Sequence, residues 1–368
     1  MKINTLAVVC LSSSASIATA GGFDAQTLST SFMYEEGSSA SISYATLDAN
    51  VAREYTGPVG AGIPGTIKTL KDTTFMSAGF KTNFNDFDIG ISNYTSGVIL
   101  LNTGAAPVPS ADAKISTTTI LAKYNVGENL AILGGANMNN LRASGIVSVA
   151  GAYDMAASSA TSVVAGVAYI IPEIALRAEL LYQAKSSFGT TSDFTGAGPL
   201  AGVNLSNTET AISRPETLTL NFQTGIAEGT LLFGSVYQAK WAGAPVTIDL
   251  GNDAFNAADI DESFDTSTKY TVGVGRKLTD SLSVLASYST EAGSSDPITS
   301  LFTMTNGSTA ISVGAKYAVS DTAAITVGVQ QTTYGNVDVD WSGTGPGVDA
   351  EYRGSTATTG VISLAYSF

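Results

Sequence analysis

The sequence predicts an all-β fold, an antiparallel transmembrane β-barrel of fourteen strands. Three observations predict it: strands with one apolar and one polar face, short connections that alternate with long ones, and no apolar run long enough to cross a membrane as a helix. A secreted β-sandwich or β-helix is the alternative for a mildly hydrophobic, exported chain.

The final strand shows the two-faced pattern most clearly. One face is formed by Ile362, Leu364, Tyr366 and Phe368 and the other by Ser363, Ala365 and Ser367. In a membrane barrel the apolar face meets lipid and the small polar face meets the lumen. The aromatic last residue, Phe368, resembles the signal that the bacterial outer-membrane insertion machinery reads, so we expect that machinery as a partner.

The first twenty residues (1–20) are predicted to be a cleaved signal peptide. Lys2 provides a positive start, residues 6–11 are apolar, and Ala18-Thr19-Ala20 has the small residues of a cleavage site. The mature chain would begin at Gly21. Because Cys10 leaves with the signal peptide, no disulfide or thiolate chemistry is expected.

The composition argues against several classes of function. The sequence has 17 basic and 31 acidic residues, and removal of Lys2 with the signal peptide leaves 16 basic ones. The mature chain would therefore carry a formal charge of −15, which argues against nucleic acid as a partner. Histidine, the commonest general base and metal ligand, does not occur in the sequence. We therefore expect no enzyme activity, no catalytic residue, no metal site and no cofactor. Calcium binding by the acidic loops stays open, although a solvated acidic face is the simpler interpretation.

Fourteen segments carry the period-two pattern of half-buried strands, near 39–50, 73–82, 87–95, 112–125, 129–142, 158–170, 174–188, 214–225, 229–241, 266–276, 281–291, 308–318, 322–335 and 353–368. Six of the connections are tight and seven are long: 51–72, 96–111, 143–157, 189–213, 242–265, 292–307 and 336–352. Short periplasmic turns that alternate with long external loops are typical of bacterial outer-membrane barrels, and an even strand count places both ends of the barrel on the periplasmic side.

Aromatic residues near the strand ends predict two girdles at the membrane interfaces. The periplasmic girdle would contain Phe80, Tyr124, Tyr317, Tyr366 and Phe368, and the outer girdle Tyr182, Tyr237, Trp241 and Tyr288. A position in the core or the lumen is the alternative for each of them.

The region 214–241 resembles a hairpin of the FadL/TodX family of outer-membrane transport proteins for hydrophobic compounds. It opens with Pro215, turns at Phe222-Gln223-Thr224-Gly225-Ile226-Ala227 and closes with Trp241. The strand pairs around 270–284 and 313–329 agree with it. The resemblance covers most of the mature chain and is most specific in this hairpin.

The resemblance implies a fourteen-strand barrel with a short amino-terminal hatch in its lumen. Residues 21–38 would be the hatch and 39–368 the barrel. It also implies passive uptake of long-chain fatty acids or other hydrophobic compounds through the outer membrane of a Gram-negative bacterium. The third strand lacks the proline that marks the lateral exit in the family, and Gly97 is the candidate for a bulge in its place.

Candidate ligand contacts follow from the chemistry that a hydrophobic substrate requires, which is an apolar pocket with a few polar groups. In the hatch they are Phe23, Phe32, Met33 and Tyr34, and on lumen faces Arg177 and Lys269 for a carboxylate. An external capture surface is predicted from the apolar loop residues Val98, Ile99, Leu100, Leu101, Leu301, Phe302 and Met304. The alternative for the hatch residues is permanent packing as a structural plug. For the two cations it is ion pairing with acids in the lumen, and for the loop residues it is packing between loops.

Two other functions stay open at this point. The acidic charge and the lumen faces rich in Ser and Thr also fit a general porin with cation preference, and the long acidic loops fit a structural or adhesive surface barrel. In each case the expected surroundings are outer-membrane lipid and lipopolysaccharide.

Overall fold

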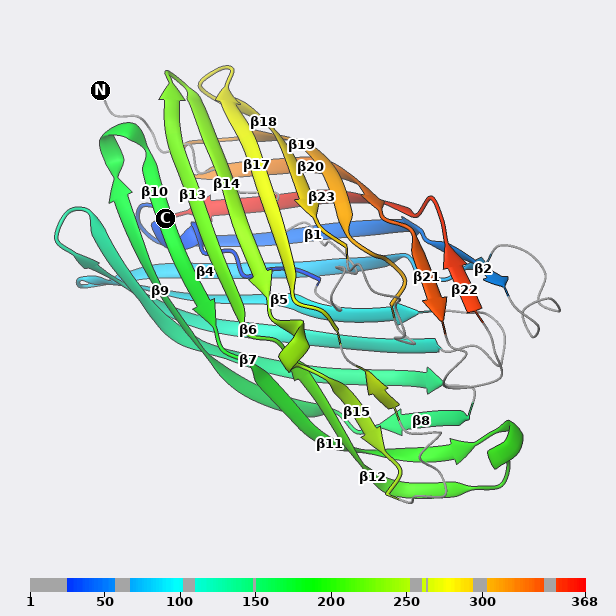
Figure 1. Cartoon of the computed structure of the whole chain (residues 1–368). Coiled ribbons are helices and arrows are strands. Elements are labelled where there is room, and N and C mark those ends of the chain that lie inside the picture. Colours follow the sequence, from blue (N-terminus) through cyan, green and yellow to red (C-terminus); the bar gives the residue numbers. More distant parts are fainter. Residues whose placement is uncertain are drawn as a thin grey trace.

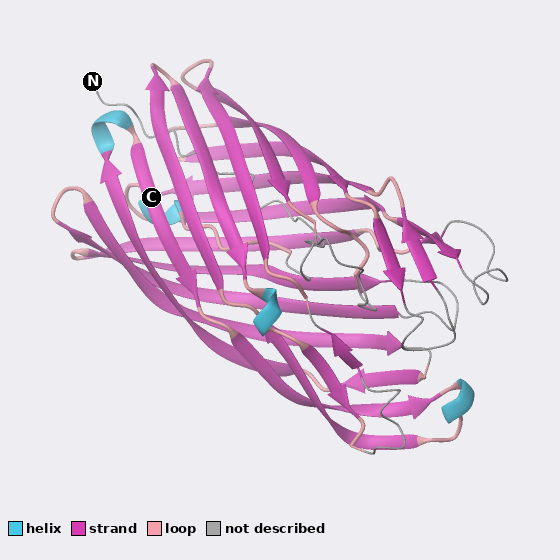
Figure 2. Cartoon of the chain, viewed as in Figure 1, coloured by secondary structure: helices cyan, strands magenta, loops and turns pink. Residues whose placement is uncertain are grey.

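The computed structural model describes residues 25–56, 67–101, 110–147, 150–251, 260–262, 264–293, 303–340 and 349–368. Most of these residues lie in strands, which wind into a barrel with further strands beyond one of its ends (Figure 1; Figure 2). Helical structure in this part of the chain is limited to the short 3₁₀ turns η2 (Ser31–Tyr34), η4 (Pro172–Ile174), η5 (Gly198–Leu200) and η6 (Trp241–Gly243). No helix among the described residues is long and apolar enough to cross a membrane.

Within the described residues, fourteen strands form the barrel wall, and each pairs antiparallel with its successor in the order β1 (Ser39–Asn50), β4 (Thr73–Phe84), β5 (Phe87–Leu101), β6 (Ser110–Val126), β7 (Leu130–Val147), β9 (Ser158–Ile171), β10 (Leu176–Gln183), β13 (Thr217–Ala227), β14 (Thr230–Ala239), β17 (Ser267–Lys277), β18 (Leu282–Glu291), β19 (Ser308–Ala318), β20 (Ala323–Tyr334) and β23 (Thr356–Ser367). β1 also pairs with β23, from Ser39↔Ser367 to Asn50↔Thr356, and this pairing closes the ring. The predicted antiparallel barrel and its strand number are confirmed.

The two faces of the wall strands differ as predicted. On β23, Ile362, Leu364 and Tyr366 are exposed on the outer face, whereas Ser363 is buried on the inner one. Side chains alternate between the faces of a strand, so each strand contributes an apolar outer surface and a largely polar or small-residue inner surface. Such an outer surface suits lipid contact.

The tight turns gather at the end of the barrel where β1 begins and β23 ends (Figure 1). Four of these turns contain a residue in the left-handed region: Asn85 with φ 53°, Gly127 with φ 69°, Ala175 with φ 52° and Gly229 with φ 64°. A positive φ gives a short hairpin turn the twist of its two strands, and Asn and Gly adopt it at low cost. We call this end the turn end and the opposite one the mouth.

At the mouth, several predicted strand boundaries are wrong. β5 continues to Leu101 and β7 to Val147, although 96–111 and 143–157 were expected to be loops. The strand expected over 174–188 ends at Gln183, and β11 (Ser186–Gly196) and β12 (Asn204–Arg214) form a hairpin beyond it, in place of the expected loop 189–213. β10 pairs directly with β13, so this hairpin extends outward from the wall.

Other long connections also contain strands. β8 (Gly151–Met155), β15 (Val246–Asp249) and β16 (Ile260–Glu262) extend the barrel sheet, and β2 (Ala52–Thr56), β3 (Ile67–Lys68), β21 (Val337–Asp340) and β22 (Asp349–Tyr352) form a separate four-stranded sheet. These short strands could not be predicted from their polar local sequences, because they form only by pairing with segments that are distant in the chain.

The aromatic girdle at the turn end is present as predicted. Its members are exposed on the outside of the wall: Phe80, Tyr124, Tyr317, Tyr366 and Phe368. The Phe368 ring lies 6.2 Å from that of Phe80 and 5.9 Å from that of Tyr366, measured between centroids.

The predicted girdle at the mouth is wrong for two of its four residues. Tyr182 and Tyr288 are exposed, but Tyr237 and Trp241 are buried. Tyr237 faces the lumen, opposite Lys269 of β17. Trp241 begins η6 and packs edge-on against Phe264, with 5.7 Å between the ring centroids.

The direct pairing of β10 with β13 predicts that the hairpin is dispensable for barrel closure. Replacing residues 188–212 by an Asn-Gly turn should leave a barrel that still shifts its gel mobility on heating, because the wall pairs persist. Heat-modifiable migration and far-ultraviolet circular dichroism would measure this. Failure of the shortened chain to assemble, while replacement of the exposed residues 201–202 alone is tolerated, would contradict it.

Candidate functional site

The lumen is layered, and the inward residues of one strand show the order. From the mouth to the turn end, β6 carries Ile115, then Thr117 and Thr119, then Leu121, and finally Lys123, all of them buried. On β7 the first three kinds follow in the same order, with Leu141, then Asn139 and Asn137, then Leu133. The charged layer continues on the other side of β6, with Asp88 of β5 and Lys81 of β4. A molecule that moves along the axis would therefore meet four different chemical environments.

The first layer is an apolar cluster at the mouth, which we call the mouth cluster. It is continuous from the ends of β5, β6 and β7 to β11, β12, η6 and the outer four-stranded sheet. Its largest buried members include Trp241, Tyr153, Phe188, Phe194, Tyr352 and Leu101. Such a cluster offers the surroundings that an apolar molecule prefers over water.

The second layer is a belt of hydroxyl and amide side chains that bond to each other across the wall. Thr117 donates to Asn139 (2.7 Å), and Asn139 donates to Ser186 (3.3 Å). One level closer to the turn end, Asn137 accepts from Thr119 and donates to Gln183 (3.0 Å). Because these groups satisfy each other, the belt is polar at little cost to the buried atoms.

The third layer is the segment 25–38, which lies inside the barrel and which we call the hatch. Its turn η2 packs against the inner faces of the wall strands, with Met33 completely buried beside Leu121, Leu133 and Leu181. The packing on β5 is close: a Cβ on Gly90 would lie 2.3 Å from the Met33 sulfur.

The start of the hatch is tied to an irregularity in β5. The register between β5 and β6 shifts between Thr95 and Gly97. At that point the backbone N–H groups of Ala25 and Gln26 donate to the carbonyls of Ser96 (3.1 Å) and Thr95 (2.9 Å). A bulge leaves a residue outside the ladder, and here the hatch uses the freed carbonyl groups.

The body of the hatch is held by Glu179 of β10, whose side chain is completely buried. The carboxylate accepts hydrogen bonds from the hydroxyls of Thr30 (2.5 Å) and Tyr34 and from the amide of Asn221 (3.0 Å). Burial, with the Glu179 carboxylate beside it, raises the pKa of Tyr34 above its ordinary value, so its hydroxyl stays protonated and donates.

Closer to the turn end, the lumen contains a group of three buried charges. Asp88 lies 3.1 Å from the ammonium of Lys81 and 2.7 Å from that of Lys123. Lys81 also donates to the hatch carbonyls of Glu35 (2.6 Å) and Gly37 (2.8 Å). The Asp88 carboxylate is thus shared by two ammonium groups, and the two hatch carbonyls accept further hydrogen bonds from Lys81.

Where the hatch joins β1, it is fixed to the last strand. The backbone of Ser38 donates to the carbonyl of Phe368 (3.2 Å) and accepts from its N–H (2.9 Å). The closing seam therefore continues by one pair into the hatch.

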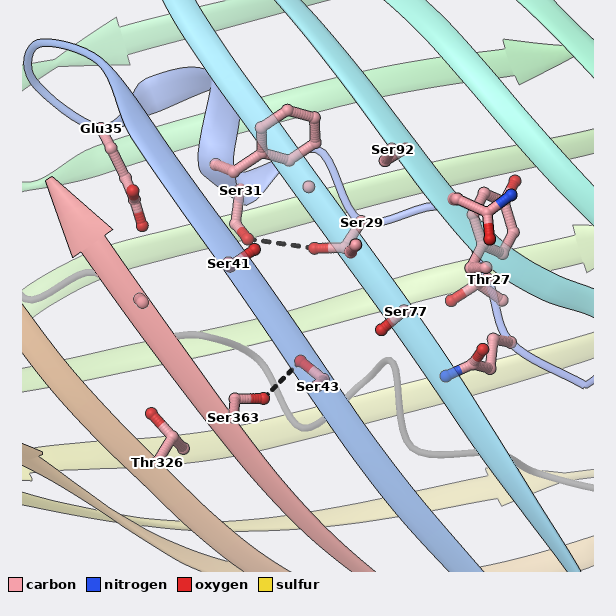
Figure 3. A pocket seen from close by; sticks show the side chains of 17 residues that line it. Thr27, Ser29, Ser31, Glu35, Ser41, Ser43, Ser77, Ser92, Thr326 and Ser363 are labelled. Carbon is pink, nitrogen blue, oxygen red and sulfur yellow. Dashed lines mark hydrogen bonds between the residues drawn. The ribbon is translucent and has the colours of Figure 1, made fainter.

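On the side away from β10, the hatch leaves a cavity of about 90 Å³ (Figure 3). Small and hydroxyl side chains from β1, β4, β5, β20 and β23 face it, with Ser43 and Ser363 bonded to each other (2.5 Å) and Ser29 and Ser31 likewise (3.0 Å). Phe32, Tyr94 and Ala365 line the cavity as well, so it presents both hydroxyl and apolar surfaces. The hatch is therefore seated against one side of the wall.

The predicted hatch contacts Phe32, Met33 and Tyr34 all lie in η2 and pack with the wall, whereas Phe23 lies outside the described residues. Their role as ligand contacts stays a prediction. Arg177 lies over the Tyr34 ring at 4.3 Å, near the turn end of β10. Lys269 lies near the mouth end of β17, opposite Glu291, so the structure does not bring the two predicted cations together.

The expected capture surface is placed differently. Val98, Ile99, Leu100 and Leu101 are not in a loop; they belong to β5, are at most 8% exposed and join the mouth cluster, because β5 continues to pair with β6 beyond the bulge. Met304 is buried in the same cluster. Leu301 and Phe302 lie outside the described residues. Capture by these residues and a lateral exit at Gly97 stay predictions.

Sequence reasoning did not select the belt residues Asn137, Asn139 and Gln183 or the charges Lys81 and Asp88. Each lies on a polar strand face, where many side chains look alike. The signal that could have found them is their size: each is a larger amide or charged side chain on an inner face where Ser, Gly or Thr is common.

The close approach at Gly90 predicts that a larger residue there displaces the hatch. Gly90→Val should drive a methyl into Met33 and Phe32, at a cost of about 1–3 kcal/mol for overpacking. We expect more frequent ion-conducting events in planar bilayers. Gly134→Val is the matched control, since nothing lies within 4 Å of its Cβ position. Equal conductance of the two variants would contradict the proposed packing.

The contacts of Glu179 predict that it anchors the hatch. Glu179→Ala removes the acceptor of three hydrogen bonds, each worth about 1.5–3 kcal/mol when one group is charged. Amide hydrogen exchange in residues 25–38 should accelerate by at least about tenfold. The exposed Glu173 supplies the control Glu173→Ala. Unchanged exchange in the Glu179 variant would show that the hatch is held by packing alone.

No protein-family model matches the sequence, and no curated protein matches it. Solved structures do match the fold. A FadL homologue of Pseudomonas aeruginosa has a TM-score of 0.73 at 13% identity over 92% of each chain. The toluene transporters TodX of Pseudomonas putida and TbuX of Ralstonia pickettii each have a TM-score of 0.62 at 12% identity over 97% of both chains. The resemblance noted in the sequence is thus confirmed for the fold: the chain forms a FadL-type barrel with a hatch in its lumen.

Proposed function

We propose that the protein is a passive transporter for hydrophobic compounds in the outer membrane of a Gram-negative bacterium. The observation that carries this proposal is the combination of an apolar mouth cluster with a hatch that occupies the lumen beneath it. An open pore for polar solutes would need neither feature. The likeness of the fold to the FadL homologue and to the toluene transporters supports the same proposal.

In this proposal the substrate enters from the mouth and first occupies the mouth cluster. Transfer from water into such surroundings is favourable by about 0.8 kcal/mol for each buried CH₂ group. Beyond the cluster it meets the hydroxyl and amide belt and then the hatch, so further movement requires a rearrangement. The bulge near Gly97, where the hatch is tied to β5, is the proposed point of rearrangement and exit through the wall.

The substrates we propose are long-chain fatty acids or other hydrophobic compounds of similar size. Residues 1–20 would direct export, Phe368 would be recognised by the insertion machinery, and the mouth would face the lipopolysaccharide layer. The outer aromatic and aliphatic surface of the wall supports this membrane location.

Removal of residues 25–38 from the otherwise complete chain tests the proposal. The intact protein should be nearly silent in planar bilayers and should speed the entry of a hydrophobic probe into vesicles. The shortened protein should conduct steadily and lose the probe selectivity, because the contacts with Glu179 and Lys81 that fill the lumen are gone. An intact protein that already conducts as an open pore would refute the proposal and favour a porin.

A further inference from the structure

A buried arginine at the mouth has no role in the contacts described above. Arg214 is the last residue of β12 and is 3% exposed. Its partner across the ladder is Ser186 of β11, whose hydroxyl accepts from Asn139 of the belt (3.3 Å). Residues paired across a ladder point to the same face of the sheet, so Arg214 lies on the lumen side, where the belt meets the mouth cluster.

The positive charge of Arg214 is not neutralised within the described part of the chain. Its Nε is buried without a hydrogen-bond partner, and no ion pair of its guanidinium occurs among the described residues. The nearest acid in the sequence, Glu216, is bonded instead to Lys240 (2.5 Å) and Tyr182 (3.0 Å). By contrast, the buried Lys81 and Lys123 share Asp88. A buried charge is normally paired, because its transfer from water is costly.

The surroundings of Arg214 fit a carboxylate with an apolar chain. Ser186 accepts from Asn139 through its oxygen, which leaves the hydroxyl proton to donate, so two donors stand side by side on adjacent strands. The next inward pair toward the mouth is Phe188 and Ile212, both buried in the mouth cluster. A guanidinium binds both oxygens of a carboxylate, and the apolar pair would accommodate the chain attached to it.

We propose that Arg214 and Ser186 bind the carboxylate of a single-chain hydrophobic acid at the junction of the mouth cluster and the belt. This inference rests on the proposed transport function and narrows its substrate class to acids over neutral hydrocarbons. The site differs from Arg177 and Lys269, the cations predicted from the sequence, because Arg177 stacks on Tyr34 and Lys269 faces Glu291.

The test compares two probes of equal chain length, octanoate and octanol, titrated calorimetrically at pH 8 into the complete mature protein in nanodiscs of neutral lipid. The intact protein should bind octanoate about tenfold to a hundredfold more tightly than octanol, as expected for one charge-assisted contact. This comparison needs no variant. Arg214→Met should remove the preference while octanol binding persists, and Arg214→Lys should keep part of it.

Arg142→Met is the matched control, because it removes the same charge from an exposed position on β7 and should leave the preference intact. Should Arg214→Met fail to show heat-modifiable migration, Ser186→Ala gives a second variant with a smaller expected loss of preference. Equal affinity for both probes in the intact protein would overturn the acid site and leave the transport proposal standing. A preference that Lys269→Met abolishes and Arg214→Met keeps would overturn it as well. Binding of neither probe would remove both proposals.

Discussion

In lipid, a backbone N–H or C=O group without a partner costs several kcal/mol, and the architecture of this protein depends on that constraint. The ladder between β1 and β23 meets it by closing the sheet on itself along the whole length of both strands. Once the wall is closed, the alternation of side chains assigns every second residue to lipid and every other one to the lumen. The layers of the lumen are thus consequences of strand register: Thr117 follows Ile115, and Leu121 follows Thr119, at intervals of two.

Inside the ring, the same requirement for partners explains how the hatch is held. Where β5 departs from regular pairing, the hatch supplies the missing hydrogen bonds from Ala25 and Gln26. Lys81 shares the Asp88 carboxylate with Lys123, and two hatch carbonyls accept its other hydrogen bonds. The hatch and the wall therefore satisfy each other, and each would leave buried polar groups unpaired without the other. Arg214 differs, because its buried Nε has no hydrogen-bond partner in the hatch or the wall among the described residues. This is why we propose that a bound molecule supplies the partner.

Much of the fold was predictable because the wall strands repeat one simple pattern. Leu218, Leu220 and similar outward residues alternate with Thr and Ser over long stretches, and tight turns at Asn85 and Gly127 carry their own local signals. The mouth was not predictable to the same extent. Short strands such as β11 and β12 pair with segments far away in the chain, so their local sequence resembles that of a loop. Sequence periodicity does not determine where a strand ends. It therefore could not show that β14 ends at Ala239 and that Trp241 lies in η6, nor that Tyr237 faces the lumen.

The two hydrogen bonds between Ser38 and Phe368 join the last residue of the hatch to the end of the closing strand. The pair that extends the β1–β23 ladder is therefore also an attachment of the hatch. Movement of the hatch away from Phe368 would remove this pair from the turn end of the seam, and loosening of the seam there would release one end of the hatch. The closure of the wall and the position of the hatch are thus coupled at this point.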